Sequence, residues 1–309
     1  MASPNFDLSA ESVTPDASPR QQNMHSANLR EFIASNPLKP ATGTDILGEQ
    51  IAQKLKVAPY LEDQALENYF NPRQCPRILL VATHGIFLPN QPEAPTPTPT
   101  YHRESDLLQR DNRISSRVEN PMLRSALALA RANTWAKGGK LPPEAGKGIL
   151  FAQDVAGLDL WANEITVLSA CETGIGDIAI GEGVFGLRRA FAVAGAKTLI
   201  MSLWSVNGWT TALLMERFFD NCEAGFGRAV ALQEAQNYLR NITVRELQQF
   251  ELGQNILKYE FNNGRELDAA MLARQAEDKP LAHPYYWGAW ICQGETKAVE
   301  MFKLDEIEQ

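Results

Sequence analysis

The chain has 309 residues, 44% of them hydrophobic and 21% charged, which is typical of a soluble globular protein with one large domain plus extensions. Its net charge is −8, its pI is about 5.2, and it contains no run of lysine and arginine. The sequence therefore argues against a nucleic-acid-binding surface. No apolar stretch resembles a signal or membrane segment, so we expect a cytoplasmic protein without a membrane partner.

The cysteine pattern argues against metal binding and against a disulfide framework. Cysteines stand at positions 75, 171, 222 and 292 without any C-x-x-C pair, and the chain has only four histidines. We therefore expect no metal and no cofactor. A reducing cytoplasm suits a protein that needs a free thiol.

The amino-terminal third predicts a tail followed by the start of a parallel sheet. Residues 1–35 are polar and predict a disordered, mobile tail. Thr44 or Asp45 can cap a helix that presents one apolar face up to Leu55, and residues 56–61 read as a short strand. A short helix from Asp63 and a buried strand over 77–83 follow, and this β, α, β order is typical of a parallel sheet.

The middle of the chain predicts a long excursion between sheet elements. Residues 88–120 are proline-rich and then polar, which predicts an inert surface loop. Apolar spacing over 121–132 predicts a helix, residues 146–151 a small hairpin arm, and residues 154–160 a helical turn. A strand over 165–170 comes next.

The remainder predicts helices alternating with two more strands. We expect helices over 182–193, 209–223 and 228–239, a strand over 197–204, a charged and partly helical insertion over 241–280, and a last strand within 284–292. The chain is thus predicted to form one α/β domain over residues 36–296, as a three-layer α/β/α structure with a mostly parallel sheet flanked by helices. Residues 297–309 are predicted to be a C-terminal tail.

A glycine motif inside this domain invites a nucleotide-binding interpretation that the sequence does not favour. Residues 181–186 match G-x-G-x-x-G, yet these glycines lie about ten residues beyond the preceding strand, and no acidic residue follows at about twenty residues to bind a ribose. We expect instead that the glycines let a helix pack closely beside the neighbouring turn.

Two predicted strands end in residues that could form a catalytic pair. Cys171 follows the predicted strand over 165–170, and Gly174 comes three residues later. His84 follows the predicted strand over 77–83 and is followed directly by Gly85. Ligands of parallel sheets sit beyond the carboxyl ends of the strands, and a thiol there is a candidate nucleophile with the imidazole as its base. The alternative is that both are ordinary structural residues, since lone cysteines usually behave as small buried hydrophobes. His102, within the loop, and His283, in a His-Pro turn, are weaker candidates for the base.

Several segments resemble the CHAT family of caspase-like domains. They are Ala82-Thr-His-Gly, Asn120-Pro-Met-Leu-Arg-Ser-Ala, Asp154-Val-Ala-Gly-Leu-Asp-Leu, Val167-Leu-Ser-Ala-Cys-Glu-Thr-Gly, Gly181-Glu-Gly-Val-Phe-Gly-Leu, Ser202-Leu-Trp-Ser-Val and His283-Pro-Tyr-Tyr-Trp-Gly. The similarity spans about Pro37 to Gly294 in the family's order.

The resemblance implies a caspase-like fold and a cysteine endopeptidase that uses a His/Cys dyad. It implies that His84 and Cys171 are catalytic, and that the backbone N–H groups of Gly85 and Cys171 hold the oxyanion. The implied partners are a protein or peptide substrate and a regulatory protein. The alternative is a catalytically silent caspase-like scaffold for protein–protein interaction.

The same resemblance directs attention to the substrate's P1 side chain. Ser169, Trp204 and Asn207 are the expected substrate contacts. Related chains often carry an acid after the Leu-Trp-x-Val segment, where this chain has Asn207 and Gly208. Without that charge we expect a neutral or apolar P1 residue, unless an acid comes from elsewhere, such as Glu172, Asp177 or the insertion over 241–280.

Overall fold

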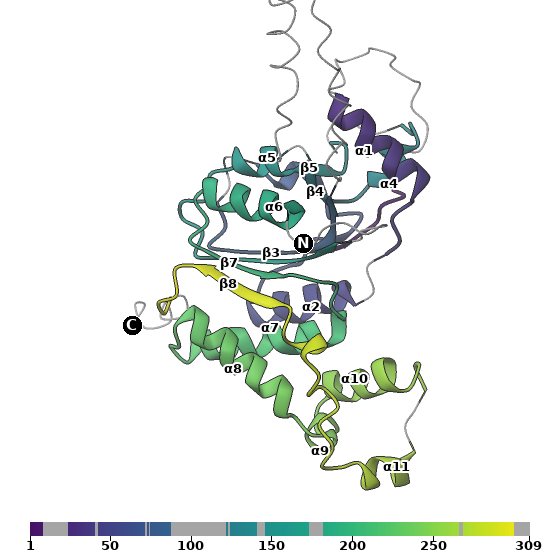
Figure 1. The fold of residues 1–309 in the computed structure, drawn as a ribbon, viewed down its shortest axis with the longest axis vertical. Coiled ribbons are helices and arrows are strands. Elements are labelled where there is room, and N and C mark those ends of the chain that lie inside the picture. The colour runs from purple at the N-terminus through teal and green to yellow at the C-terminus, as the bar shows by residue number, and fades with distance from the viewer. Residues whose placement is uncertain are drawn as a thin grey trace, which may run out of the picture.

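A mostly parallel β-sheet forms the centre of the protein (Figure 1). The computed structural model describes residues 1–8, 24–40, 43–71, 73, 75–87, 122, 124–140, 146–172, 182–265 and 268–299. In spatial order the main path of the sheet is β2 (Leu61–Glu62), β1 (Ala2–Pro4), β3 (Ile78–Phe87), β6 (Ile165–Glu172), β7 (Thr198–Ser202) and β8 (Trp290–Gly294).

Strand directions within the sheet change only at its margins. The pairs β1–β2, β1–β3, β3–β6 and β6–β7 are parallel, whereas β8 pairs antiparallel with β7. A side branch adds β4 (Ser125–Ala128), antiparallel to the end of β3, and β5 (Ile149–Phe151), antiparallel to β4. The predicted α/β class with a mostly parallel sheet is confirmed.

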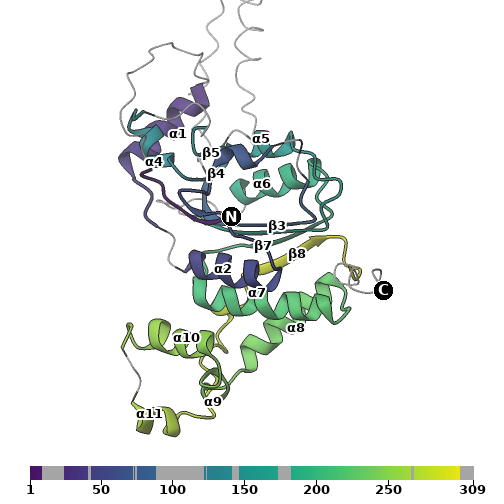
Figure 2. The same cartoon turned by 180° about the vertical axis from the view of Figure 1, so that it is seen from behind.

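Helices cover both faces of the sheet, which gives the three predicted layers. The helices α5 (Ala152–Ala156) and α6 (Glu182–Val193) lie on one face, and α2 (Thr44–Lys54), α7 (Gly208–Glu223) and α8 (Arg228–Asn241) lie on the other (Figures 1 and 2). One apolar core lies between the sheet and each helical layer. A third core lies beside β4 and β5, under α1 (Met24–Ser35) and α4 (Ala132–Ala136).

The insertion over 241–280 is largely helical, as predicted. It contains α9 (Val244–Leu247), α10 (Glu251–Phe261) and α11 (Ala269–Arg274), which lie beyond α7, away from the sheet (Figure 1). Leu247, Leu252 and Ile256 join the core beneath α7. Within the described ranges, no helix combines the length and apolar character that a membrane span requires.

The prediction of a disordered tail over 1–35 is wrong for residues 1–8 and 24–35. Strand β1 lies inside the sheet, where the Met1 nitrogen donates to the Leu80 carbonyl at 2.9 Å and the Ala82 N–H donates to the Met1 carbonyl at 2.9 Å. Ala2 and Phe6 are fully buried. The alternation of Ala2, Pro4 and Phe6 was a strand signal, but the segment is too short to stand out among polar neighbours.

Two further element predictions are corrected. Residues 121–132 do not form a helix, because Ser125–Ala128 is strand β4 and every residue from Ser125 to Ala130 is buried. Pairing with the end of β3 overrides the helix propensity of alanine and leucine there. The predicted helix from Asp63 is only a 3₁₀ turn, Glu67–Tyr69. The predicted loop 88–120 lies outside the described residues, as do residues 300–309 of the predicted C-terminal tail.

Candidate active site

Strands β3 and β6 bring the two predicted catalytic positions side by side. They pair in parallel over eight positions, with His84 opposite Cys171 and Gly85 opposite Glu172. Both strands are apolar runs because the sheet is covered on both faces. Adjacent strands lie about 4.8 Å apart, so positions 84 and 171 are backbone neighbours at the carboxyl edge.

The imidazole of His84 is held by a backbone oxygen and an aromatic ring. Its Nε2 lies 2.6 Å from the carbonyl oxygen of Lys39, and the ring of Phe6 stacks against it with centroids 5.4 Å apart and an interplanar angle of 24°. A carbonyl oxygen only accepts hydrogen bonds, so Nε2 must be the donor. In the neutral ring Nδ1 then carries the free lone pair.

This environment changes the proton affinity of His84. Burial lowers the pKa of the ring below its ordinary value, and the Lys39 carbonyl opposes that shift by stabilising the protonated form. At neutral pH the ring is therefore uncharged. A neutral imidazole with a fixed tautomer is suited to accepting a proton at Nδ1.

Backbone geometry near the ends of the two strands explains the glycine at position 85, and Ser169 lies buried in β6. A Cβ on Gly85 would lie 2.9 Å from the carbonyl oxygen of Ala170 and 3.2 Å from the ring of Phe87, so position 85 requires glycine. Ser169 pairs with Ala82 and is 5% exposed. The oxyanion role of Gly85 and the substrate contact of Ser169 stay predictions.

Asn207 lies at the start of α7 and uses both ends of its amide. Its Oδ1 accepts a hydrogen bond from the Thr210 N–H at 3.1 Å, which caps the helix. Its Nδ2 donates to Oε2 of Glu260 at 2.6 Å. Glu260 belongs to α10 of the insertion and also hydrogen-bonds to Tyr286, whose pKa is raised by burial first and by the charge of Glu260 second. A carboxylate thus reaches the position where related chains carry an acid.

Aromatic side chains surround this Asn207–Glu260 contact. Trp209 and Tyr259 stack with centroids 5.1 Å apart and an interplanar angle of 3°. Trp204 is 39% exposed and donates from Nε1 to the Tyr285 carbonyl at 3.5 Å. These rings come from the start of α7, the end of α10 and the segment between β7 and α7. The insertion therefore helps to build this wall.

One short segment links His84 to the start of α7. Lys39 contacts the imidazole, and Gly43, four residues later, packs against the backbone of Gly208. A Cβ on Gly208 would lie 2.5 Å from the Cα of Gly43. The close approach of these two glycines excludes an acidic side chain at position 208, which explains part of the departure noted from the sequence.

Other titratable candidates have structural roles where the structure describes them. Nδ1 of His283 accepts from the Tyr285 N–H at 3.2 Å and caps a 3₁₀ turn, which confirms the structural interpretation of that residue. Burial raises the pKa of Cys222 to about 12 and also raises that of Cys292, so neither is a ready nucleophile. His102 and Asp177 lie outside the described residues.

Three contributors to this site have no clear signal in the sequence. Lys39 acts through its carbonyl oxygen, which every residue type has, so no sequence signal could identify it. Phe6 lies in the segment whose polar composition predicts a tail. Glu260 was covered only by the general alternative that an acid comes from the insertion, because nothing in the sequence indicates which helical face meets Asn207.

Comparison with known proteins gives a match over nearly the whole described chain. The model of the CHAT domain matches residues 1–295. A search of curated proteins finds no match.

Proposed function

Because this chain belongs to the CHAT domain family, which is caspase-like and related to cysteine peptidases, we propose that it is a cysteine endopeptidase with Cys171 as nucleophile and His84 as base. The observation that carries the proposal is the register of β3 and β6, which pairs His84 with Cys171 at the carboxyl edge of the sheet. The hydrogen bond from Nε2 of His84 to Lys39 supports it further.

The proposed reaction uses the free Nδ1 of His84. Nδ1 takes the proton from the Cys171 thiol, and the thiolate attacks the carbonyl carbon of the scissile peptide bond. The same proton then passes from Nδ1 to the departing amine, which leaves a thioester on Cys171. Water, deprotonated by Nδ1, attacks the thioester and releases the acid product while the proton returns to sulfur.

The Lys39 carbonyl supports this cycle in two ways. It fixes the tautomer, so that the lone pair is always at Nδ1, and it stabilises the imidazolium that forms after the first proton transfer. The developing negative charge on the substrate oxygen is assigned to backbone N–H groups of Gly85 and Cys171. Gly85 lies within β3, and Cys171 lies within β6, one residue before that strand ends.

Glu260 changes the proposal for the P1 side chain. The expectation of a neutral or apolar P1 residue rested on the lack of an acid at positions 207 and 208. Because Glu260 lies 2.6 Å from Asn207, we assign it the missing charge and propose that arginine and lysine are accepted at P1. Asn207, Trp204 and Trp209 would form the rest of that wall.

An electrophilic peptide probe tests the endopeptidase proposal. A peptide with a C-terminal acyloxymethyl ketone should label the full chain once, and the modified residue identified by mass spectrometry should be Cys171. Cys171→Ala should abolish labelling and peptide turnover, whereas Cys75→Ala should keep both.

The melting temperature separates loss of chemistry from loss of fold. We expect Cys171→Ala to leave Tm nearly unchanged, since a small thiol contributes little packing energy. If the wild-type chain is neither labelled nor able to cleave any member of a peptide library, with Tm intact, the silent scaffold replaces the endopeptidase.

A further inference from the structure

Two contacts hold the His84 imidazole, and the segments that provide them meet at one buried residue, Asn133. The Lys39 carbonyl accepts from Nε2, and the ring of Phe6 stacks on the imidazole. Asn133 lies in the first turn of α4 and is 1% exposed. It hydrogen-bonds to the residue before Lys39 and to the backbone of Phe6.

The side-chain amide of Asn133 pairs with the backbone of Leu38. Its Oδ1 accepts from the Leu38 N–H at 2.9 Å, and its Nδ2 donates to the Leu38 carbonyl at 2.9 Å. The amide thus takes the place of a neighbouring strand. The side chain of Leu38 is itself buried in the third core. Both backbone polar groups and the side chain of Leu38 are therefore fixed.

Lys39 is restrained from its other side by Pro40. A residue that precedes proline is confined to extended backbone angles, because the proline ring clashes with the alternatives. Leu38 fixes the chain before Lys39, so little freedom remains for the Lys39 carbonyl that faces Nε2 of His84. Lys39 as a whole is exposed, and only its backbone takes part in this contact.

The backbone at the start of α4 holds the segment that carries Phe6. The Asn133 N–H donates to the Phe6 carbonyl at 3.0 Å, and the Arg131 N–H donates to the Asn5 carbonyl at 2.9 Å. Nδ2 of Asn133 also donates to Oδ2 of Asp7 at 3.3 Å. The Phe6 ring is buried and stacks on His84 from this position.

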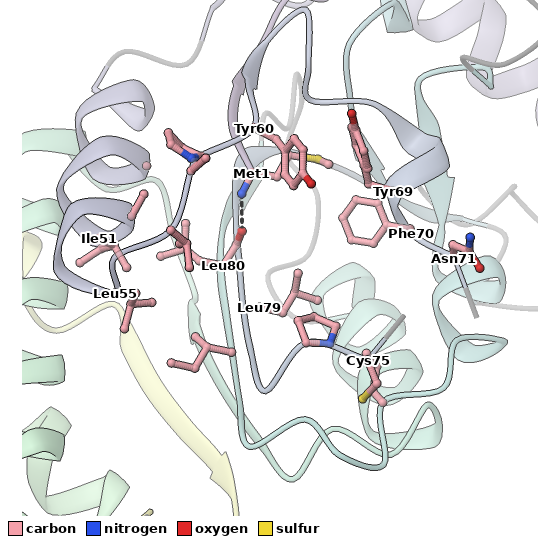
Figure 3. Close-up of a pocket in the computed structure, with 18 of the residues that line it drawn as sticks. Met1, Ile51, Leu55, Tyr60, Tyr69, Phe70, Asn71, Cys75, Leu79 and Leu80 are labelled. Carbon is pink, nitrogen blue, oxygen red and sulfur yellow. Dashed lines mark hydrogen bonds between the residues drawn. The ribbon is translucent and has the colours of Figure 1, made fainter. Parts of the chain in front are cut away.

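A second buried asparagine provides a purely structural comparison. Asn163 is 0% exposed, its Nδ2 donates to the Pro76 carbonyl at 2.8 Å, and its Oδ1 accepts from Oγ1 of Thr166 at 2.9 Å. These partners lie at the amino ends of β3 and β6, where Leu79 and Cys75 border a cavity (Figure 3). The two asparagines are alike in burial and bonding but serve opposite ends of the same strands.

We propose that Asn133 is a positioning residue of the candidate active site, which holds the Lys39 carbonyl and the Phe6 ring in place and through them orients the His84 imidazole. The inference rests on the proposed function, in which His84 is the base. Asn133 itself touches neither the substrate nor the reacting atoms.

Loss of the amide should release the tautomer of His84. Without its two bonds to Leu38, the segment that carries the Lys39 carbonyl can move away from Nε2. The neutral ring then exchanges its proton between the two nitrogens. Only the form with a free lone pair at Nδ1 can accept the thiol proton in the proposed reaction.

Nitrogen NMR of the His84 ring tests the proposal without any need for peptidase activity. The full chain is labelled with ¹⁵N at its four histidines, spectra are recorded at pH 8, and His84→Gln identifies the His84 signals. In the wild type the protonated Nε2 and the bare Nδ1 should have widely separated shifts. Asn133→Ala should narrow this separation because both tautomers become populated, and Asn163→Ala should keep the wild-type value.

Thermal melts and a second variant separate positioning from general loosening. Asn133→Ala and Asn163→Ala should lose similar amounts of melting temperature, since each leaves buried backbone groups without a partner. Asn133→Ser retains an acceptor for the Leu38 N–H, replaces Asn133→Ala if that variant does not fold, and should also narrow the separation. An unchanged separation in the folded Asn133 variants overturns the proposal. Equal narrowing in Asn163→Ala also overturns it, because the loss of any buried amide would then disturb the ring.

Peptide turnover is the second readout. Asn133→Ala should lower kcat about tenfold or more, because misplacement of a catalytic group slows the chemical step, and it should leave KM nearly unchanged. Asn163→Ala should keep the wild-type kcat. A rise in KM with kcat unchanged would overturn the positioning role. If the wild-type chain cleaves no peptide, the endopeptidase proposal fails, and the NMR comparison alone decides whether Asn133 positions His84.

Discussion

The two ends of β3 are built differently. At the carboxyl end, Gly85 to Phe87 pair with β4, His84 pairs with β6, and Phe6 and Lys39 hold the imidazole. At the amino end, the edge from Ile78 to Leu80 borders a cavity with exposed apolar residues at its mouth. One strand thus has a carboxyl end that neighbouring strands and side chains cover and an amino end that borders a cavity.

The difference follows from the path of the first eight residues. They run along β3 from Leu80 toward its carboxyl end, so that Phe6 reaches His84. A catalytic base needs a fixed orientation, which packing and a backbone acceptor provide.

Replacing Phe6 should break the covered end and have the largest effect on stability. Phe6 is 2% exposed, and removal of a buried phenylalanine ring costs about 3–5 kcal/mol. Phe6→Ala should therefore lower the free energy of unfolding by about that amount in urea titrations, and peptide turnover should fall because the His84 ring loses its support.

Tyr69→Ala is the matched change at the open end. Tyr69 is 37% exposed and stacks on Tyr60, a contact worth about 0.5–1.5 kcal/mol. Equal losses of stability in the two variants would contradict the contrast between the two ends.

The parts of the fold that the sequence predicted are those whose pattern is long and apolar. β3 and β6 are buried on both faces and read as continuous runs, and α2 and α7 show helical spacing over eleven and sixteen residues. β1 has three residues, and two of the four residues of β4 are alanine. Such segments become strands through tertiary pairing, which local propensity does not contain.

The residues of the candidate site likewise fall into those that the sequence indicates and those that it does not. His84 and Cys171 could be found because strand ends and residue chemistry mark them in the sequence. The acceptor at Lys39 is a backbone atom, and the contact of Glu260 with Asn207 depends on how the insertion folds back on α7. Neither of these two contacts leaves a recognisable pattern in a single sequence.

Gly208→Ala should disturb the link between the two halves of the candidate site. The added Cβ would meet the backbone of Gly43 at 2.5 Å, and neither backbone can yield as a side chain could. We expect a loss of about 1–3 kcal/mol in the free energy of unfolding. Gly157→Ala is the control, since its nearest contact would be 3.4 Å away, and it should be close to neutral. Similar stability of both variants would show that the two glycine segments are not held together.

Glu260→Gln should change specificity with little change in stability. The amide keeps the shape of the side chain but removes the charge, so kcat/KM for arginine at P1 should fall about tenfold relative to a neutral P1 residue. A fluorogenic substrate panel measures this ratio. Glu251→Gln, at the exposed start of the same helix, is the control and should leave it unchanged. An unchanged ratio in Glu260→Gln would remove Glu260 from the P1 wall.

The smallest effect concerns pH and follows from the covered end of β3. Burial lowers the pKa of His84 in the folded protein, so between that value and the ordinary pKa of about 6.5 the unfolded chain binds more protons. The stability that His84 contributes is therefore present above pH 6.5 and is lost as pH falls through the folded-state pKa. His84→Gln, which keeps an N–H donor for Lys39, should lose less stability than wild type between pH 8 and pH 5, and thermal melts at both values measure the difference. The acid limb of kcat/KM for the wild-type chain should likewise lie below pH 6.5. A variant whose melting temperature tracks the wild type at both pH values would show that the ring is not shifted by its surroundings.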